Sequence, residues 1–193
     1  EAWYPGEEGG KALASVLFGD YNPAGRLPVT FARSVDQLPE FADYAMYSGH
    51  TYRFLKYDPL YPFGYGLSYT QFAYSDLEID TGKGQTDSTI YVSAVVKNIG
   101  QRAGEEVVQL YVTDDESSYP VPVRHLEGFD RIALEPGQSE KITFVLDPSQ
   151  LAAFDDEGQR HVEPGTFTVS VGGGQPLANS PLPFVQGQFS LKA

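Results

Sequence analysis

The sequence predicts a mainly β protein, in which an immunoglobulin-like β-sandwich follows the C-terminal portion of an α/β domain. First, 20 glycines and 14 prolines, spread through turn-like contexts, favour many short elements over long helices. Second, residues 74–193 contain short runs in which apolar and polar residues alternate, which is typical of strands. Third, residues 1–73 offer one helix and one strand, which cannot enclose a core.

The first expected element is a helix over Glu7–Phe18. Leu13, Val16 and Leu17 fall at helical spacing, and the turn Pro5-Gly6 precedes them. Because much of the circumference is apolar, we expect this helix to be buried against a sheet.

A short strand is expected over Arg26–Phe31, where Pro28 restricts it to a sheet edge or a strand start. After Phe31, no helix or hairpin is expected for about 40 residues, although loops of that length are uncommon inside a compact domain. We therefore expect residues 1–73 to be the tail of a larger α/β domain, with an aromatic segment lying across other surfaces.

Residues 74–193 are expected to form the sandwich. The alternation over 89–99 places Ile90, Val92, Ala94 and Val96 on one face. Further strands are expected over residues 74–79, 105–113, 123–134, 140–146, 165–171 and 184–191. Their inward residues include Val108, Leu110, Val112, Ile142, Phe144, Leu146, Phe167, Val169 and Val171. About seven strands at this spacing indicate a sandwich of the immunoglobulin or fibronectin type III kind.

The charge balance limits the partners of the chain. A net charge of −13 would repel a phosphate backbone and an anionic membrane surface, so we expect neither nucleic acid nor membrane as a partner. The absence of cysteine excludes disulfides and thiol nucleophiles. It does not fix the compartment, so secreted, periplasmic and cytoplasmic locations all stay open.

Acidic residues cluster at Glu105-Glu106, Asp114-Asp115-Glu116 and Asp155-Asp156-Glu157. None has the alternate-residue spacing of a calcium loop, and we interpret them as solvated turns. Nor do adjacent carboxylates on exposed turns provide the buried, separated pair that glycoside hydrolysis requires.

The remaining candidates for chemistry are weak. His50, His125 and His161 lack metal-ligand spacing, so surface or hydrogen-bonded roles are favoured. No nucleophile elbow or phosphate-binding glycine loop is present. The sequence therefore predicts no catalytic residue, no metal ligand and no cofactor, and it assigns no residue to substrate binding.

An aromatic run over residues 57–70 is the most unusual stretch. Its Tyr and Phe side chains could stack on sugar rings, or they could anchor an extended segment between two domains. Proline prevents regular sheet pairing there and glycine allows tight bends, so we favour the anchoring role.

Four motifs in order resemble the C-terminal part of glycoside hydrolase family 3. They are Trp3-Tyr4-Pro5-Gly6-Glu7-Glu8-Gly9-Gly10, then residues 17–31, then Gly49-His50-Thr51-Tyr52-Arg53-Phe54, and then residues 61–70. The later stretch, with residues 95–100, 104–112, 126–129 and 134–137, resembles the fibronectin type III-like domain of such enzymes. The resemblance covers essentially the whole chain.

The resemblance implies an exo-acting, retaining β-glycosidase that removes terminal non-reducing β-D-glucosyl or β-D-xylosyl residues. Its Asp nucleophile would lie on a TIM-like barrel, and its Glu acid/base would lie upstream of Trp3. The chain is then expected to be a fragment that is inactive alone. Residues 1–73 would be the tail of the family 3 α/β-sandwich domain with an interdomain strap, and residues 74–193 the fibronectin type III-like domain.

The expected partner is the remainder of the same enzyme, namely the barrel and the N-terminal part of the α/β domain. An oligosaccharide or an aryl β-glycoside would be the substrate of the intact enzyme, and a homodimer stays open. It also stays open whether Trp3 or the segment 44–50 approaches the sugar pocket. The alternative function is a noncatalytic module that binds carbohydrate or a protein partner.

Overall fold

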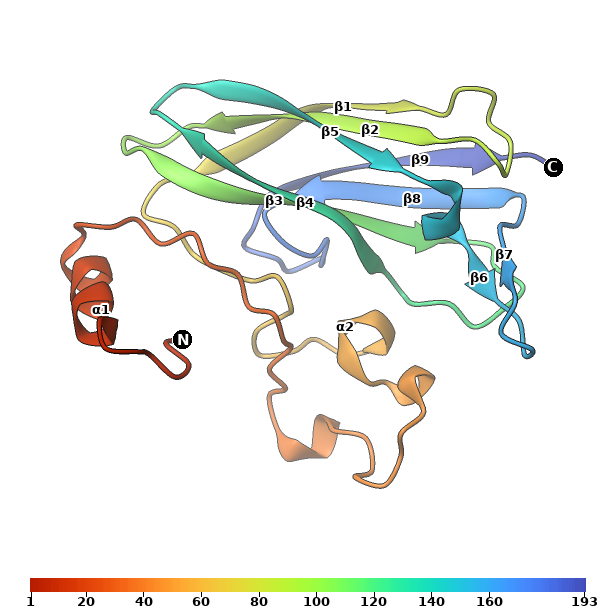
Figure 1. Cartoon of the computed structure of the whole chain (residues 1–193), viewed down its shortest axis with the longest axis horizontal. Coiled ribbons are helices and arrows are strands. Elements are labelled where there is room, and N and C mark those ends of the chain that lie inside the picture. Colours follow the sequence, from red (N-terminus) through yellow and green to blue (C-terminus); the bar gives the residue numbers. More distant parts are fainter.

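Two antiparallel sheets form the body of a computed structural model that describes residues 1–193. One sheet has the order β1-β2-β5, from β1 (Phe72–Asp80), β2 (Ile90–Asn98) and β5 (Ser139–Leu146). The other has the order β4-β3-β8-β9, from β4 (His125–Leu134), β3 (Gly104–Asp114), β8 (Gly165–Gly172) and β9 (Phe184–Leu191). Figure 1 shows the two sheets stacked as a sandwich. The expected fold class is confirmed.

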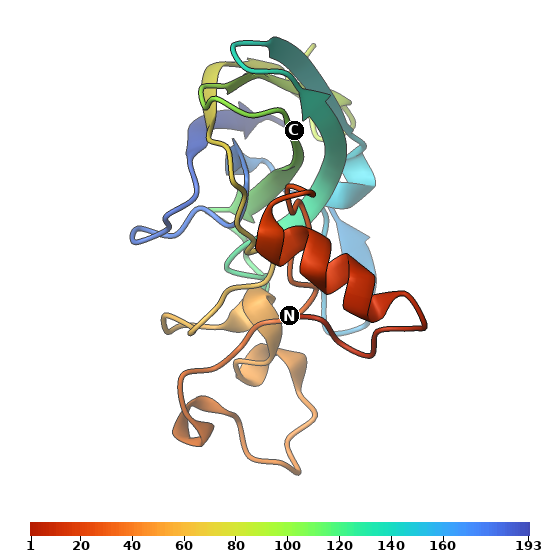
Figure 2. The same ribbon diagram turned by 90° about the vertical axis from the view of Figure 1, so that its left-hand side faces the viewer.

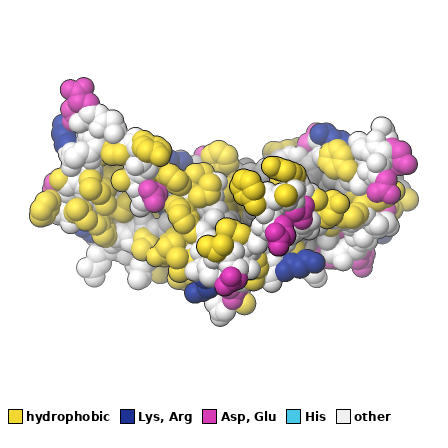
Figure 3. Space-filling view, turned by 90° about the horizontal axis from the view of Figure 1, so that it is seen from below, with side chains coloured by type: hydrophobic (Ala, Val, Ile, Leu, Met, Phe, Trp, Pro, Cys, Tyr) yellow, Lys and Arg dark blue, Asp and Glu magenta, His cyan; other side chains and the backbone are white.

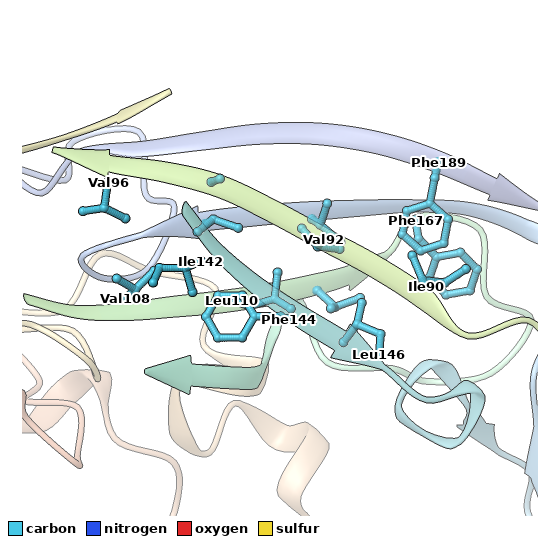
Figure 4. Close-up of a cluster of buried hydrophobic side chains, with 14 of the residues drawn as sticks. Ile90, Val92, Val96, Val108, Leu110, Ile142, Phe144, Leu146, Phe167 and Phe189 are labelled. Atoms are coloured by element: carbon cyan, nitrogen blue, oxygen red, sulfur yellow. The ribbon is translucent and has the colours of Figure 1, made fainter. Parts of the chain in front are cut away.

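The core lies between the sheets and follows the predicted alternation. All of the residues expected to point inward are buried, and Figure 4 shows Val92 and Ile142 from one sheet beside Val108 and Leu110 from the other. Phe167 and Phe189 stack at one end of this core, with ring centroids 5.4 Å apart. Nineteen buried side chains form one contiguous cluster, so the sandwich has a core of its own.

The strand bounds lie close to the predicted ones, and one hairpin is new. β6 (Ala153–Phe154) and β7 (Arg160–His161) pair across the turn that contains Asp155 and Gly158. Two-residue strands are too short for the alternation to reveal them. The short 3₁₀ helix η3 (Pro148–Leu151) joins β5 to this hairpin.

The residues before β1, which we call the N-terminal arm (residues 1–71), run beneath the sandwich (Figures 1 and 2). The arm contains α1 (Gly9–Phe18) and three single turns: η1 (Val35–Gln37), η2 (Met46–Ser48) and α2 (Thr51–Phe54). These turns correct the expectation that residues 32–71 hold no helix. None of the helices is long and apolar enough to cross a membrane.

The expectation of a strand over Arg26–Phe31 is wrong. The segment is extended and lies against residues 60–65, with Leu27 N–H donating to the Tyr65 carbonyl at 2.9 Å and Phe31 N–H to the Tyr61 carbonyl at 2.8 Å. Only the bridge between Phe31 and Tyr61 counts as β pairing. Pro28 lacks an N–H, so the ladder is interrupted before a regular strand can form.

The expected burial of the helix is also absent. α1 has no buried residue, and Leu13, Leu17 and Phe18 are 50%, 69% and 84% exposed. The helix begins at Gly9 rather than at Glu7. Its amphipathic pattern identified an apolar face, but no part of this chain covers that face.

Asn98 closes the β2–β3 turn from inside the fold. It is fully buried, and its Nδ2 donates to the carbonyls of Leu134 at 2.9 Å and Arg102 at 2.8 Å. Its Oδ1 accepts from the Thr70 hydroxyl at 2.7 Å and from Gly100 N–H at 3.0 Å. The one side chain thereby joins β4, the turn and the last residues of the arm.

Replacing Asn98 by alanine should lower the free energy of unfolding by about 2 kcal/mol, because buried donors and acceptors would lose their partners. Urea unfolding monitored by circular dichroism would measure the change. Lys97→Ala, next to it on the exposed side of β2, is the matched control and should stay within about 0.5 kcal/mol of the parent chain. Equal effects of the two substitutions would contradict this role of Asn98.

Candidate functional site

The interface between the arm and the sandwich contains a buried ion pair. Arg26 of the arm donates through Nη2 to the carboxylate of Glu106 on β3, and the two side chains are 8% and 5% exposed. The remaining guanidinium nitrogens donate to the main-chain carbonyls of Ala24, Gly25 and Gly173. Burial raises the pKa of Glu106, while Arg26 and the Val107 amide oppose that rise.

A second set of buried polar contacts lies beside this pair. Gln109 Nε2 donates to the carbonyls of Gly64 and Gly173, both at 3.0 Å, and its Oε1 accepts from the Tyr111 hydroxyl at 2.7 Å. Gln175 repeats the arrangement, since its Nε2 donates to the carbonyl of Phe63 at 2.9 Å. These contacts fix residues 63–64 of the arm on the outer face of the β4-β3-β8-β9 sheet.

Aromatic side chains complete the contact. Tyr52 stacks on Phe63 with centroids 4.3 Å apart, and the Tyr111 ring meets Tyr52 edge-on at 6.2 Å. The Tyr52 hydroxyl also accepts from Leu126 N–H at 3.0 Å. Phe63 of the aromatic run therefore packs in the contact between the arm and the sandwich. Other members of the run, such as Tyr61 and Tyr69, stay 44% and 47% exposed.

A shallow pocket opens where the aromatic run meets the β8–β9 loop. Its volume is about 220 Å³. The lining residues are Arg33, Asp58, Pro59, Leu60, Tyr61, Pro62, Tyr65, Leu177, Asn179, Ser180 and Pro181. The rings of Tyr61 and Tyr65 lie 5.4 Å apart, and Phe31 connects Tyr61 to Trp3. Trp3, one of the two candidates for approaching a sugar, thus lies in this aromatic cluster with 54% of its surface exposed.

The other candidate segment, residues 44–50, presents exposed aromatic side chains. Tyr44 and Tyr47 are 85% and 68% exposed. The amide of Ala45 donates to Asp43 Oδ1 at 2.9 Å, which lowers the pKa of that carboxyl. His50 Nε2 is enclosed without a hydrogen-bond partner.

The three histidines are not brought together. His125 pairs with Glu127 on β4, and His161 Nε2 contacts Asp155 Oδ2 at 2.6 Å across the β6–β7 hairpin. No group of three or more His, Cys, Asp or Glu side chains is arranged to hold a metal ion.

One acidic cluster was interpreted wrongly. Glu105 and Glu106 lie within β3 rather than on a turn, and Glu106 is buried. Asp114 is the last residue of β3, whereas Asp115, Glu116 and the cluster from Asp155 follow strands. There Asp155 Oδ1 accepts from Gln159 N–H at 2.7 Å and Asp115 Oδ2 from the Thr168 hydroxyl at 2.6 Å. Glu106 is the single buried carboxylate, and its bond to Arg26 and its enclosure leave it no access to a glycosidic oxygen.

The buried set formed by Arg26, Glu106, Gln109 and Tyr111 was missed in the sequence. For Glu106 a signal existed, because it shares the inward parity of Val108, Leu110 and Val112 on β3. For Arg26 the sequence contained no such signal, since its partner Glu106 is 80 positions away.

Comparison with known proteins agrees with this picture. Residues 1–69 match the model of the glycosyl hydrolase family 3 C-terminal domain, and residues 106–175 match the fibronectin type III-like domain. The chain is 41% identical over 184 residues to a periplasmic β-glucosidase of Salmonella typhimurium, covering 89% of this chain and 24% of that protein. A β-xylosidase of Formosa agariphila is 43% identical over 176 residues, with 89% and 24% covered.

Solved structures give the same result. β-Glucosidase 3B from Thermotoga neapolitana, in complex with glucose, superposes with a TM-score of 0.85 and 33% identity, covering 97% of this chain and 27% of that one. The sandwich and its docked arm therefore correspond to the C-terminal region of family 3 glycoside hydrolases, which is the region that these matches cover. The chain belongs to glycoside hydrolase family 3. It spans about a quarter of the length of the curated relatives that it matches.

Proposed function

We propose that this chain is the C-terminal part of an exo-acting, retaining β-glycosidase that releases terminal β-D-glucosyl or β-D-xylosyl residues. This proposal is supported by relatives that are about 40% identical over most of the chain and are β-glucosidases and β-xylosidases. Within such an enzyme this part supplies domain completion and stability, and the catalytic carboxylates lie elsewhere. Residues 1–73 would complete the α/β-sandwich domain and strap it to the fibronectin type III-like domain of residues 74–193.

The observation that carries the proposal is an uncovered apolar surface on the arm. It includes the α1 face formed by Leu13, Leu17 and Phe18, together with Tyr4 and Phe41, which are fully and 94% exposed. Figure 3 shows hydrophobic side chains gathered across the side of the molecule from which the arm projects. Exposed apolar patches of this kind mark interaction surfaces. The partner that fits is the remaining part of the same α/β domain, because α1 belongs to the segment that matches the family 3 domain.

Complementation tests the proposal. The chain alone should not hydrolyse aryl β-glucosides or β-xylosides, whereas the chain mixed with a polypeptide carrying the barrel and the first part of the α/β domain should do so. Leu17→Glu on the apolar face of α1 should abolish this gain of hydrolytic activity on mixing, because the substitution would bury an unpaired charge. Lys11→Glu, at a side chain that is 82% exposed, should leave the gain intact.

Two results would contradict the proposal. Turnover by the chain alone would show that the chemistry lies within these residues. An unchanged gain with Leu17→Glu would show that α1 is not the docking face.

The pocket at Tyr61 and Tyr65 favours one alternative, a noncatalytic carbohydrate-binding module, since aromatic rings beside polar groups suit a sugar ring. Equilibrium binding of the chain to cellulose, xylan and soluble oligosaccharides separates the two functions, because the first predicts little affinity. Saturable binding that Tyr61→Ala abolishes would establish the module instead.

A further inference from the structure

The C-terminal end of α1 is held from outside the helix. A helix leaves its last carbonyls without internal partners. Here the Tyr69 hydroxyl donates to the Val16 carbonyl at 2.7 Å, and Arg102 Nη2 donates to the Gly19 carbonyl at 2.7 Å. Gly19 ends the helix in the left-handed region, at φ 82°, and its own N–H also bonds to Val16. The helix is therefore anchored at this end, although none of its residues is buried.

Arg102 comes from the turn between β2 and β3, on the sandwich. Its guanidinium lies 5.8 Å from the centre of the Tyr69 ring, within the range of a cation–π contact. The C-terminus of a helix carries partial negative charge, so a cation there is favourable. Arg102 and Tyr69 thus orient each other while both bind the helix end.

The residues after α1 extend the same contact. Asn22 Nδ2 donates to the Ala103 carbonyl at 3.1 Å, and its Oδ1 accepts from Tyr69 N–H at 2.8 Å. The Tyr21 hydroxyl lies between Glu105 Oε2, at 3.3 Å, and Arg131 Nη2, at 3.1 Å. A continuous surface from the β2–β3 turn to β3 and β4 therefore meets residues 19–22 of the arm, while Tyr69 of the arm itself holds Val16.

We infer that the β2–β3 turn, with Arg102 at its centre, is a docking surface of the fibronectin type III-like domain, and that its occupant is the C-terminal end of α1. Figure 1 shows α1 at the same end of the sandwich as this turn. By holding one end of the helix, the sandwich sets the direction in which the apolar face of Leu13 and Leu17 points. What that face then meets rests on the proposed function, whereas the docking contact does not.

Amide hydrogen exchange on the 193-residue chain tests the inference, and it needs neither a glycoside nor a second polypeptide. In Arg102→Ala, the amides of Val16 to Tyr21 should lose protection on the order of tenfold, because a charge-assisted bond and its stacking partner are lost. The amides of β2, β5 and β8 should keep theirs. Arg102→Lys retains the cation and should lose less than the alanine variant.

Arg160→Ala is the matched control. Arg160 makes the same type of contact, 5.4 Å from the centre of the Phe154 ring, but on the β6–β7 hairpin. It should leave α1 exchange unchanged.

Three results would overturn the inference. They are unprotected α1 amides in the parent chain, α1 exchange in Arg102→Ala within twofold of the parent, and an equal loss of protection throughout the sandwich. The last would mean that Arg102 supports the turn itself rather than the helix.

Discussion

Arg26→Ala should destabilise the chain by about 4 kcal/mol, since it would leave the carboxylate of Glu106 buried without its partner. Arg26 also supplies donors to the carbonyls of Ala24, Gly25 and Gly173, and these would be lost together. Urea unfolding monitored by circular dichroism gives the free energy, and we expect a lower midpoint.

Two comparisons make this result specific. Arg33→Ala removes an exposed arginine of the same arm, whose Nε donates to the Asp58 carbonyl at 3.2 Å, and it should cost less than about 1 kcal/mol. The double replacement Arg26→Met with Glu106→Leu should recover much of the loss, because buried ion pairs can often be exchanged for apolar residues of similar volume. An Arg26→Ala variant within 1 kcal/mol of the parent would show that the pair contributes little.

Gly64→Ala should cost about 3 kcal/mol, because two separate effects add. Gly64 has a φ of 79°, which disfavours any residue with a Cβ atom. A Cβ there would also meet the buried side chain of Gln109 and lie 2.7 Å from the Tyr111 hydroxyl. The polar contacts that hold the arm against β3 would have to rearrange.

Gly49→Ala separates these two effects. Gly49 has a φ of 98°, but a Cβ there meets nothing within 4 Å. We therefore expect Gly49→Ala to lose only about 1 kcal/mol of stability, which is the cost of holding a residue with a Cβ at positive φ. Thermal unfolding of both variants measures the difference, which reports the clash at Gly64. Equal losses in the two variants would show that the arm adapts to the extra atom without cost.

The sequence revealed the sandwich because its strands are long enough to show a period of two. Val108, Leu110 and Val112 all lie inside as expected. The same period applied strictly would also have placed Glu106 inside. We interpreted it as solvated because its neighbour is another glutamate, and the guanidinium that neutralises it is distant in the sequence.

The arm was harder to predict because it depends on contacts that have no local pattern. Residues 26–31 have the composition of a strand, but Pro28 removes a donor and residues 60–65 provide only irregular pairing. The apolar face of α1 was recognised correctly, yet its burial could not follow, since nothing within this chain covers it. Sequence periodicity identifies a face but not what covers it.

Several hydrogen bonds at the joint between the arm and the sandwich run from a side-chain donor to a main-chain acceptor. Arg26 and Gln109 share the carbonyl of Gly173, Gln175 uses that of Phe63, and Arg102 that of Gly19. Every residue carries a carbonyl, so substitution on the acceptor side leaves the bond available wherever the new side chain fits. Mutational tolerance at this joint should therefore be unequal: the donor positions are constrained by the side chain itself, while an acceptor position is constrained only by the fit of its own residue, most strictly at Gly19 and Gly64, where φ is positive.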